Sequence, residues 1–291
     1  MVKKRLLAVD WTYREADLDA AIKHFEGYLK NRGFRRSTMD GYLACVGIYL
    51  KFAKTDRPSS DDAIKFRETL LDKNLARSTL NNYTFSIKCY HKMYGEDVSL
   101  PFTPRNNNLP YYFDQDDVSK IFSVVHNIKH LAMLKTLFFG CFRVTELCNL
   151  DDGDLDLDDL TIRVREGKGG RDGIVYIADD CAATLRRYLS VRPAFEIDGK
   201  CPLFYTDYGR RWGRGDVYRM FISYKGKAGI EKHGGVHVFS RHTAATIMIA
   251  NGCDLRTVQE LLRHRDIRTT LRYAHVSDTT KRKKYNECLT L

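Results

Sequence analysis

Apolar side chains in the first hundred residues recur with the spacing of helix faces. Apolar positions fall on one helical face in four stretches, residues 18–29, 42–50, 63–71 and 80–94. The last stretch is the clearest, because its apolar residues follow one another at intervals of 3, 4, 3 and 4. The pattern therefore predicts a small four-helix domain over residues 1–100.

The periodic pattern stops at residues 101–110, PFTPRNNNLP. This segment holds three of the six prolines and three consecutive asparagines, which favours an interdomain linker. Helical patterns resume after Asp114, an expected N-cap, and predict helices near 118–125, 131–141, 180–191, 214–228, 240–250 and 254–263. We expect Thr145 and Ser240 to cap helices and Gly252 to end one.

One segment of the second part has the alternation of a β-strand. Residues 161–165, TIRVR, alternate, a turn with four glycines follows, and residues 174–177 return. This pattern predicts a β-hairpin with a long tip that carries Lys168. The chain is thus expected to be mainly α with a small β-hairpin or sheet.

Composition narrows the class of protein. Lysine and arginine number 48 against 37 acidic residues, a net charge of +11, which favours a polyanionic partner. No apolar run reaches the ~18–20 residues of a transmembrane helix, and none has the length of a signal-peptide core. The eight cysteines are scattered without a CxxC pair, so we expect reduced thiols in the cytoplasm and no membrane association.

Two arginines stand in apolar surroundings. Arg143 lies between Phe142 and Val144, and Arg241 begins an alanine-rich helical pattern. A buried guanidinium needs an anion. That anion is either a carboxylate, for which Glu146 is a candidate beside Arg143, or a phosphate gripped by both arginines.

Other polar residues carry little signal when taken alone. Lys168 suits a solvated turn, and its GKGG lacks the spacing of an ATP-binding P-loop. His264 suits a helix C-cap. His233, His237 and His242 have no cysteine or carboxylate at metal-ligand spacing, which disfavours a zinc site.

Order and spacing connect these residues. Residues 141–150, CFRVTELCNL, resemble the first arginine box of the tyrosine recombinases, the phage-integrase and Xer-type family, and Lys168 stands where that family keeps a β-hairpin lysine. Residues 241–246, RHTAAT, resemble the second box. LLRH, ending at His264, and TLRYAHV, with Tyr273 nine residues later, resemble the remaining two.

The resemblance implies a two-domain architecture and an activity. A helical core-binding domain over 1–100 would precede a mixed, mostly helical catalytic domain over 111–291. The activity would be site-specific DNA recombination through a 3′-phosphotyrosyl intermediate, serving integration and excision or dimer resolution. The partner would be double-stranded DNA, bound by a homotetramer on two DNA sites, with no metal or other cofactor.

Residue roles also follow from the resemblance. Tyr273 would be the nucleophile, and Arg143 and Arg241 would stabilise charge on the phosphate. Lys168 would be the general acid for the leaving 5′-oxygen, and His264 would hydrogen-bond the phosphate.

Two further groups of residues would support the catalytic ones. Glu146 would orient the first arginine of the site. Basic residues of the first domain would contact DNA phosphates, and the candidates are Arg35, Arg36, Lys51, Arg77 and Lys88.

One position departs from the family pattern. The family places a histidine three residues before the second arginine, where this chain has Val238, and His237 stands one residue earlier. If Ser240 caps the following helix, His237 lies on a loop, where its ring can swing toward the phosphate. We therefore predict that His237 substitutes for the displaced histidine and that Val238→His restores some activity to a His237→Ala enzyme.

Two alternatives stay open. A type IB topoisomerase-like enzyme uses the same Arg, Lys, Arg, His and Tyr chemistry, although the helical first domain favours sequence-specific recombination. A catalytically weakened DNA-binding relative is suggested by the valine in place of the histidine.

Overall fold

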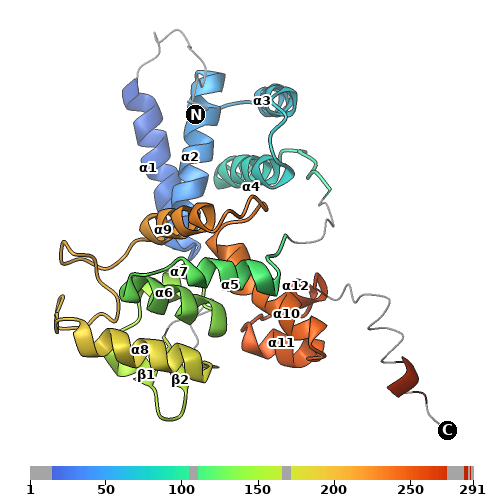
Figure 1. The fold of residues 1–291 in the computed structure, drawn as a ribbon. Coiled ribbons are helices and arrows are strands. Elements are labelled where there is room, and N and C mark those ends of the chain that lie inside the picture. Colours follow the sequence, from blue (N-terminus) through green and yellow to red (C-terminus); the bar gives the residue numbers. More distant parts are fainter. Residues whose placement is uncertain (1–14, 105–110, 166–171, 274–284, 288, 290–291) are drawn as a thin grey trace. The chain divides into compact units, whose positions relative to one another are not determined.

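The structure is a computed structural model of the chain. It describes residues 15–104, 111–165, 172–273, 285–287 and 289 (Figure 1). The chain divides into two compact units, Met1–Asn107 and Asn108–Leu291. Both are mainly helical, and the second holds a small antiparallel sheet, which confirms the expected fold class. Among the described helices, none is long and apolar enough to cross a membrane.

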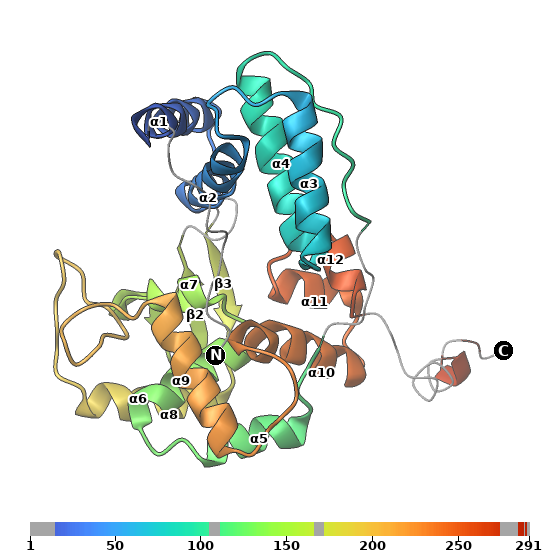
Figure 2. The same cartoon turned by 90° about the horizontal axis from the view of Figure 1, so that it is seen from above.

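The first unit consists of helices where the apolar spacing predicted them. They are α1 (Glu15–Asn31), α2 (Arg36–Ala53), α3 (Ser60–Asp72) and α4 (Arg77–Met93), and Figure 2 shows α3 beside α4. Their apolar faces share one core, whose largest buried side chains include Phe25, Tyr49, Phe66 and Tyr90. Each of these aromatic rings removes a large apolar surface from water, which stabilises the unit.

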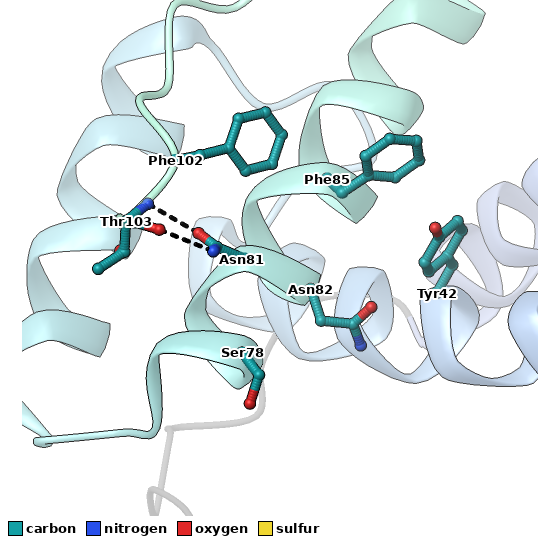
Figure 3. A pocket seen from close by; sticks show the side chains of 7 residues that line it. All are labelled: Tyr42, Ser78, Asn81, Asn82, Phe85, Phe102 and Thr103. Atoms are coloured by element: carbon teal, nitrogen blue, oxygen red, sulfur yellow. Dashed lines mark hydrogen bonds between the residues drawn. The ribbon is translucent and has the colours of Figure 1, made fainter. Parts of the chain in front are cut away.

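A clamp fastens the segment after α4 to the helix itself. Asn81 donates from Nδ2 to the carbonyl of Thr103 (2.9 Å) and accepts at Oδ1 from its N–H (2.7 Å). Beside the clamp is an open pocket of about 490 Å³ (Figure 3), lined by Tyr42, Ser78, Asn81, Asn82, Phe85, Phe102 and Thr103. Its amides and aromatic rings suit hydrogen bonding and stacking rather than acid–base chemistry.

The second unit places helices around a short sheet. The helices are α5 (Gln115–Ser123), α6 (Ile128–Phe139), α7 (Val144–Cys148), α8 (Asp179–Val191), α9 (Arg214–Lys227), α10 (Ala244–Ala250), α11 (Leu255–Leu261) and α12 (Arg268–Leu271). Asp114 caps α5 as expected, and Gly252, at φ +94°, follows the end of α10. A π-helical segment, Val238–Thr243, leads directly into α10.

The predicted hairpin is part of a three-stranded antiparallel sheet. Its strands are β1 (Leu155–Asp156), β2 (Thr161–Val164) and β3 (Gly173–Tyr176), in that order, with Ile162 opposite Val175. The short strand β1 arises within the aspartate-rich loop before the hairpin. In that loop Asp154 accepts from Arg165 at 2.6 Å, so its charge is neutralised by the protein itself.

A small apolar cluster holds the last helices of the second unit together. It joins the end of α6 to α10 and α11 through Cys141, Ala245, Val258 and Leu262, and Tyr273 is buried in the same cluster. This packing brings residues separated by more than a hundred positions into one neighbourhood.

Candidate active site

The C-terminal ends of α6 and α11 carry or adjoin residues of the site. α6 ends in a Schellman motif, in which Phe142 N–H bonds the carbonyl of Leu137 (3.0 Å) and Cys141 adopts φ +49°. α11 ends in the same way, with His264 N–H on the carbonyl of Gln259 (3.0 Å) and Arg263 at φ +53°. Arg143 follows the first motif directly, and His264 belongs to the second.

Arg241 binds both of these helix ends. Its side chain is 2% exposed, and it donates to the carbonyls of Cys141 (2.7 Å) and Leu262 (2.6 Å). These carbonyls belong to the partly unsatisfied last turns of two helices, which carry negative partial charge. Burial and two neighbouring arginines lower the pKa of Arg241 to about 10, so it stays charged at neutral pH. Backbone carbonyls thus compensate this arginine in place of the carboxylate partner considered above.

Arg143, in contrast, does pair with the carboxylate suggested by the sequence. Glu146 accepts from Arg143 N–H (2.8 Å) and from its Nη1 (2.6 Å). Arg143 is therefore the N-cap residue of α7, and the expectation that Thr145 caps this helix is wrong. Glu146 takes the place of a capping side chain because it reaches back to the free N–H. The Arg143 side chain remains 20% exposed.

His237 lies on helical backbone, not on a loop. Its φ and ψ are −69° and −37°, and the π-helical segment begins at the next residue. The expectation that Ser240 is an N-cap is therefore wrong, because Ser240 lies inside that segment. The ring of His237 packs edge-to-face on His242 at 5.2 Å between centroids, and His242 packs in turn on Tyr273 at 5.5 Å.

The histidines of the site experience a strong positive field. Burial and the charges of Arg241 and Arg143 lower the pKa of His264 to about 3. Burial and the neighbouring His237 lower the pKa of His242 to about 4. Desolvation and the same two arginines also lower the pKa of His237. All three rings are therefore neutral at pH 7, and a bound anion would relieve the repulsion that keeps them so.

Tyr273 is buried at 8% exposure at the end of this row of rings. Burial raises the pKa of its phenol, against the opposing effect of Arg241 and Arg272. The phenol is therefore protonated at neutral pH. A hydrogen bond between His264 Nδ1 and Thr270 Oγ1, at 2.9 Å, holds the His264 ring in place.

The predicted residues fall into three groups. Arg143, Arg241, His264 and Tyr273 are linked with one another by bonds, packing or charge within the second unit, and His237 belongs with them. Lys168 lies outside the described residues. The DNA-contacting candidates of the first unit form the third group.

The first-unit candidates differ in how the protein already uses them. Arg35 and Lys51 are exposed on α2 or at its start. Arg36 pairs with Asp40 at 3.0 Å. Lys88 donates to the carbonyl of Val98 at 2.7 Å, and Arg77 to that of Pro104 at 3.3 Å.

Two residues of the site have no assigned role from the sequence. In the sequence His242 is considered only as a zinc ligand, whereas in the structure its ring lies between those of His237 and Tyr273. Arg263 binds Glu146 at 2.7 Å. The signal for Arg263 was weak, because an arginine between leucine and histidine has the appearance of an ordinary charge at a helix end.

Known proteins resemble the chain over nearly its whole length. The model of the phage integrase family matches residues 111–280. Tyrosine recombinase XerD of Oceanobacillus iheyensis is 30% identical, over 92% of this chain and 97% of that protein. Tyrosine recombinase XerA of Pyrococcus horikoshii is 30% identical, over 89% and 90%.

Solved structures agree with the sequence relatives. The crystal structure of XerA recombinase has a TM-score of 0.56 at 27% identity and covers 94% of this chain and 99% of that one. The integrase of transposon Tn1549, in complex with a circular intermediate DNA, has a TM-score of 0.73 at 19% identity, over 92% and 99%. The arginines, histidines and tyrosine described above thus stand in a chain that belongs to the phage integrase family and is a tyrosine site-specific recombinase acting on DNA.

Proposed function

We propose that Arg143, Arg241 and His264 surround the scissile phosphate of DNA and that Tyr273 attacks it. The observation that carries this assignment is geometric, because Arg241 donates to the two helix ends beside Arg143 and His264, and Tyr273 is buried in the cluster that joins those ends. The arginines also create a positive field, which lowers the pKa values of the histidines around them. Such a field is unfavourable in the free protein and favourable once a phosphodiester enters, and more so as charge builds up on its oxygens during attack.

The chemistry is a transesterification. The Tyr273 oxygen forms a bond to phosphorus and gives up its proton to solvent water, and the bond from phosphorus to the 5′-oxygen breaks. Lys168 supplies the proton that the leaving 5′-oxygen takes, a role that rests on the family resemblance. The phosphotyrosyl ester stores the bond energy, so a 5′-hydroxyl of the partner strand can attack the phosphorus without ATP, which joins that strand and releases Tyr273.

His237 completes the phosphate site through the geometry of its helix. On an α-helix the family's histidine, three residues before the second arginine, is rotated by about 300° relative to that arginine. A histidine four residues before the arginine is rotated by about 400°, so its direction differs from that of the family's histidine by about 100°. A π-helix closes its bonds one residue later, so each residue rotates by only about 82° and four residues by roughly 330°. The π-helical segment Val238–Thr243 therefore supports the substitution, because it is expected to leave His237 about 30° from the direction of the family's histidine.

The protein partner we propose is the protein itself. Four protomers would act on two DNA sites, as the family resemblance implies, and the basic first unit would contribute phosphate contacts that weaken with salt. Analytical ultracentrifugation of the protein with two-site DNA tests this assembly. A complex that stays at one protomer per site without pairing of sites would contradict it.

The decisive experiment uses Tyr273→Phe. The DNA site that the protein binds is first selected from random duplexes. A nicked duplex of that site is then incubated with the wild-type protein and with the variant. Wild type should form a covalent adduct, and Tyr273→Phe should bind equally well and form none. An adduct with the phenylalanine variant would move the nucleophile to another tyrosine, such as Tyr285. Recombinant product from two-site plasmids, as opposed to relaxation alone, distinguishes a recombinase from a topoisomerase-like enzyme.

A further inference from the structure

Arg263 occupies a backbone position that suits glycine. It is the residue after the C-cap of α11, and its φ of +53° lies in the left-handed region. Glycine adopts this conformation freely, whereas a side chain with a β-carbon is strained there. A strained arginine at a helix end indicates that its side chain has a use that the backbone alone does not explain.

The Arg263 side chain runs into the site rather than into solvent. It is 16% exposed, its guanidinium stands 5.5 Å from the Phe142 ring centroid, and its Nη2 donates to Glu146 Oε2 at 2.7 Å. A β-carbon on Gly173, the first residue of β3, would lie 3.2 Å from Arg263 Cδ. The arginine is therefore packed on several sides.

Glu146 consequently stands between two guanidinium groups. Its Oε1 accepts from Arg143 Nη1 at 2.6 Å, and its Oε2 accepts from Arg263. The carboxylate is buried, and the two arginines hold its pKa below the usual value although burial opposes this. Each arginine takes part of one negative charge, so Arg143 keeps positive charge that Glu146 would otherwise neutralise.

We propose that Arg263 is a positioning residue for Arg143. It anchors the second oxygen of Glu146, which fixes the direction of the Arg143 guanidinium and leaves its charge available for the scissile phosphate. This inference rests on the proposed role of Arg143 at that phosphate. Residues that orient metal ligands typically change activity by about 10–100-fold when lost, and we expect an effect of similar size here.

Arg263→Gly is the appropriate variant, because glycine suits the backbone. Relief of the strained backbone offsets part of the lost ion pair and packing, so we expect a folded variant with unchanged affinity for the selected DNA site. Single-turnover cleavage of a nicked duplex should be slower by about 10–100-fold. Asp198→Gly is the matched control, since Asp198 is an exposed residue of the same unit with φ +51°. It should cleave at the wild-type rate.

A neutral substrate separates positioning from general damage. In a duplex whose scissile phosphate is a methylphosphonate, less charge develops and the demand on Arg143 falls. The ratio of wild-type to Arg263→Gly rates should then approach one. Equal slowing on both substrates would overturn the proposal and make Arg263 structural. Arg263→Gln, which keeps a shorter, uncharged polar side chain at the same position, should behave like the glycine variant, and a wild-type rate for it would also overturn the proposal.

The cleavage rate of Arg143→Ala shows whether a negative result contradicts this inference or the proposed function. If Arg143→Ala cleaves at the wild-type rate, the proposed function is wrong. If Arg143→Ala is slow and Arg263→Gly is not, only the positioning role is wrong. If both are slow, the double variant should be no slower than Arg143→Ala, because the two residues act through one interaction.

Discussion

Deletion of Val238 tests whether the π-helical segment before Arg241 compensates for the shifted histidine. The deletion leaves His237 three residues before the arginine, and removal of one residue allows the segment to close as an ordinary α-helix. His237 then turns by about 300° relative to Arg241, against roughly 330° in the π-helix. The ring therefore keeps its direction to within about 30°, and the deletion variant should remain active.

The expected magnitudes are set by what each change removes. Val238 is half-buried against the core of the second unit, so its loss should lower the free energy of unfolding by about 1 kcal/mol. His237→Ala removes a hydrogen-bonding group of the phosphate site and should slow cleavage by about 10–1000-fold with DNA affinity retained. In the deletion background His237→Ala should cause the same slowing, because the ring occupies the same place.

The structure also changes an expectation drawn from the sequence. Val238→His in a His237→Ala background restores the family's spacing in the sequence, with a histidine three residues before Arg241. In the π-helix, however, Val238 packs against the apolar core, and its Cγ1 would lie 3.0 Å from a β-carbon at Gly234. We therefore expect a lower melting temperature and no recovery of cleavage.

The assay is single-turnover adduct formation on the nicked selected site, with melting temperature and DNA affinity measured on the same samples. A deletion variant that folds and binds DNA, yet cleaves as slowly as His237→Ala, would refute the compensation by the π-helix. A His237→Ala enzyme at the wild-type rate would remove His237 from the site altogether.

Three further predictions concern other parts of the site. Lys168→Ala should slow cleavage of an ordinary phosphate far more than that of a 5′-bridging phosphorothiolate, since sulfur leaves without a proton, and equal slowing would reject the general-acid role. The pKa values of His264 and His242, about 3 and 4, lie below the unfolded value near 6.5. The folded protein therefore binds fewer protons, and stability present above about pH 6.5 should be lost as the pH falls toward 4. Thermal melts from pH 7 to 4 check this, and His264→Gln should flatten the dependence. Gly140→Ala should destabilise the protein by about 1–3 kcal/mol, because the new β-carbon would lie 2.3 Å from Phe142 Cε2; an unchanged denaturant midpoint would contradict the close packing.

Local periodicity predicted much of the fold. The four helices of the first unit follow from apolar residues spaced three and four apart, and the hairpin follows from alternation at Thr161–Val164. The same local signals failed at caps. Thr145 and Ser240 have the side chains of N-cap residues, but Glu146 bonds the free N–H of Arg143, and Ser240 lies within a continuous helical segment.

The order of the boxes along the sequence indicated which residues form the site, and only tertiary structure decided how they are held. Arg241 bonds a carbonyl 100 residues away, and Arg263 a carboxylate 117 residues away. Neither contact leaves a periodic trace in the sequence. The left-handed conformations of Cys141 and Arg263 were equally hidden, because neither residue is the glycine that marks such a helix end. Hydrophobic spacing records which face of an element is buried, whereas the direction of a buried charge depends on partners that only the folded chain brings within reach.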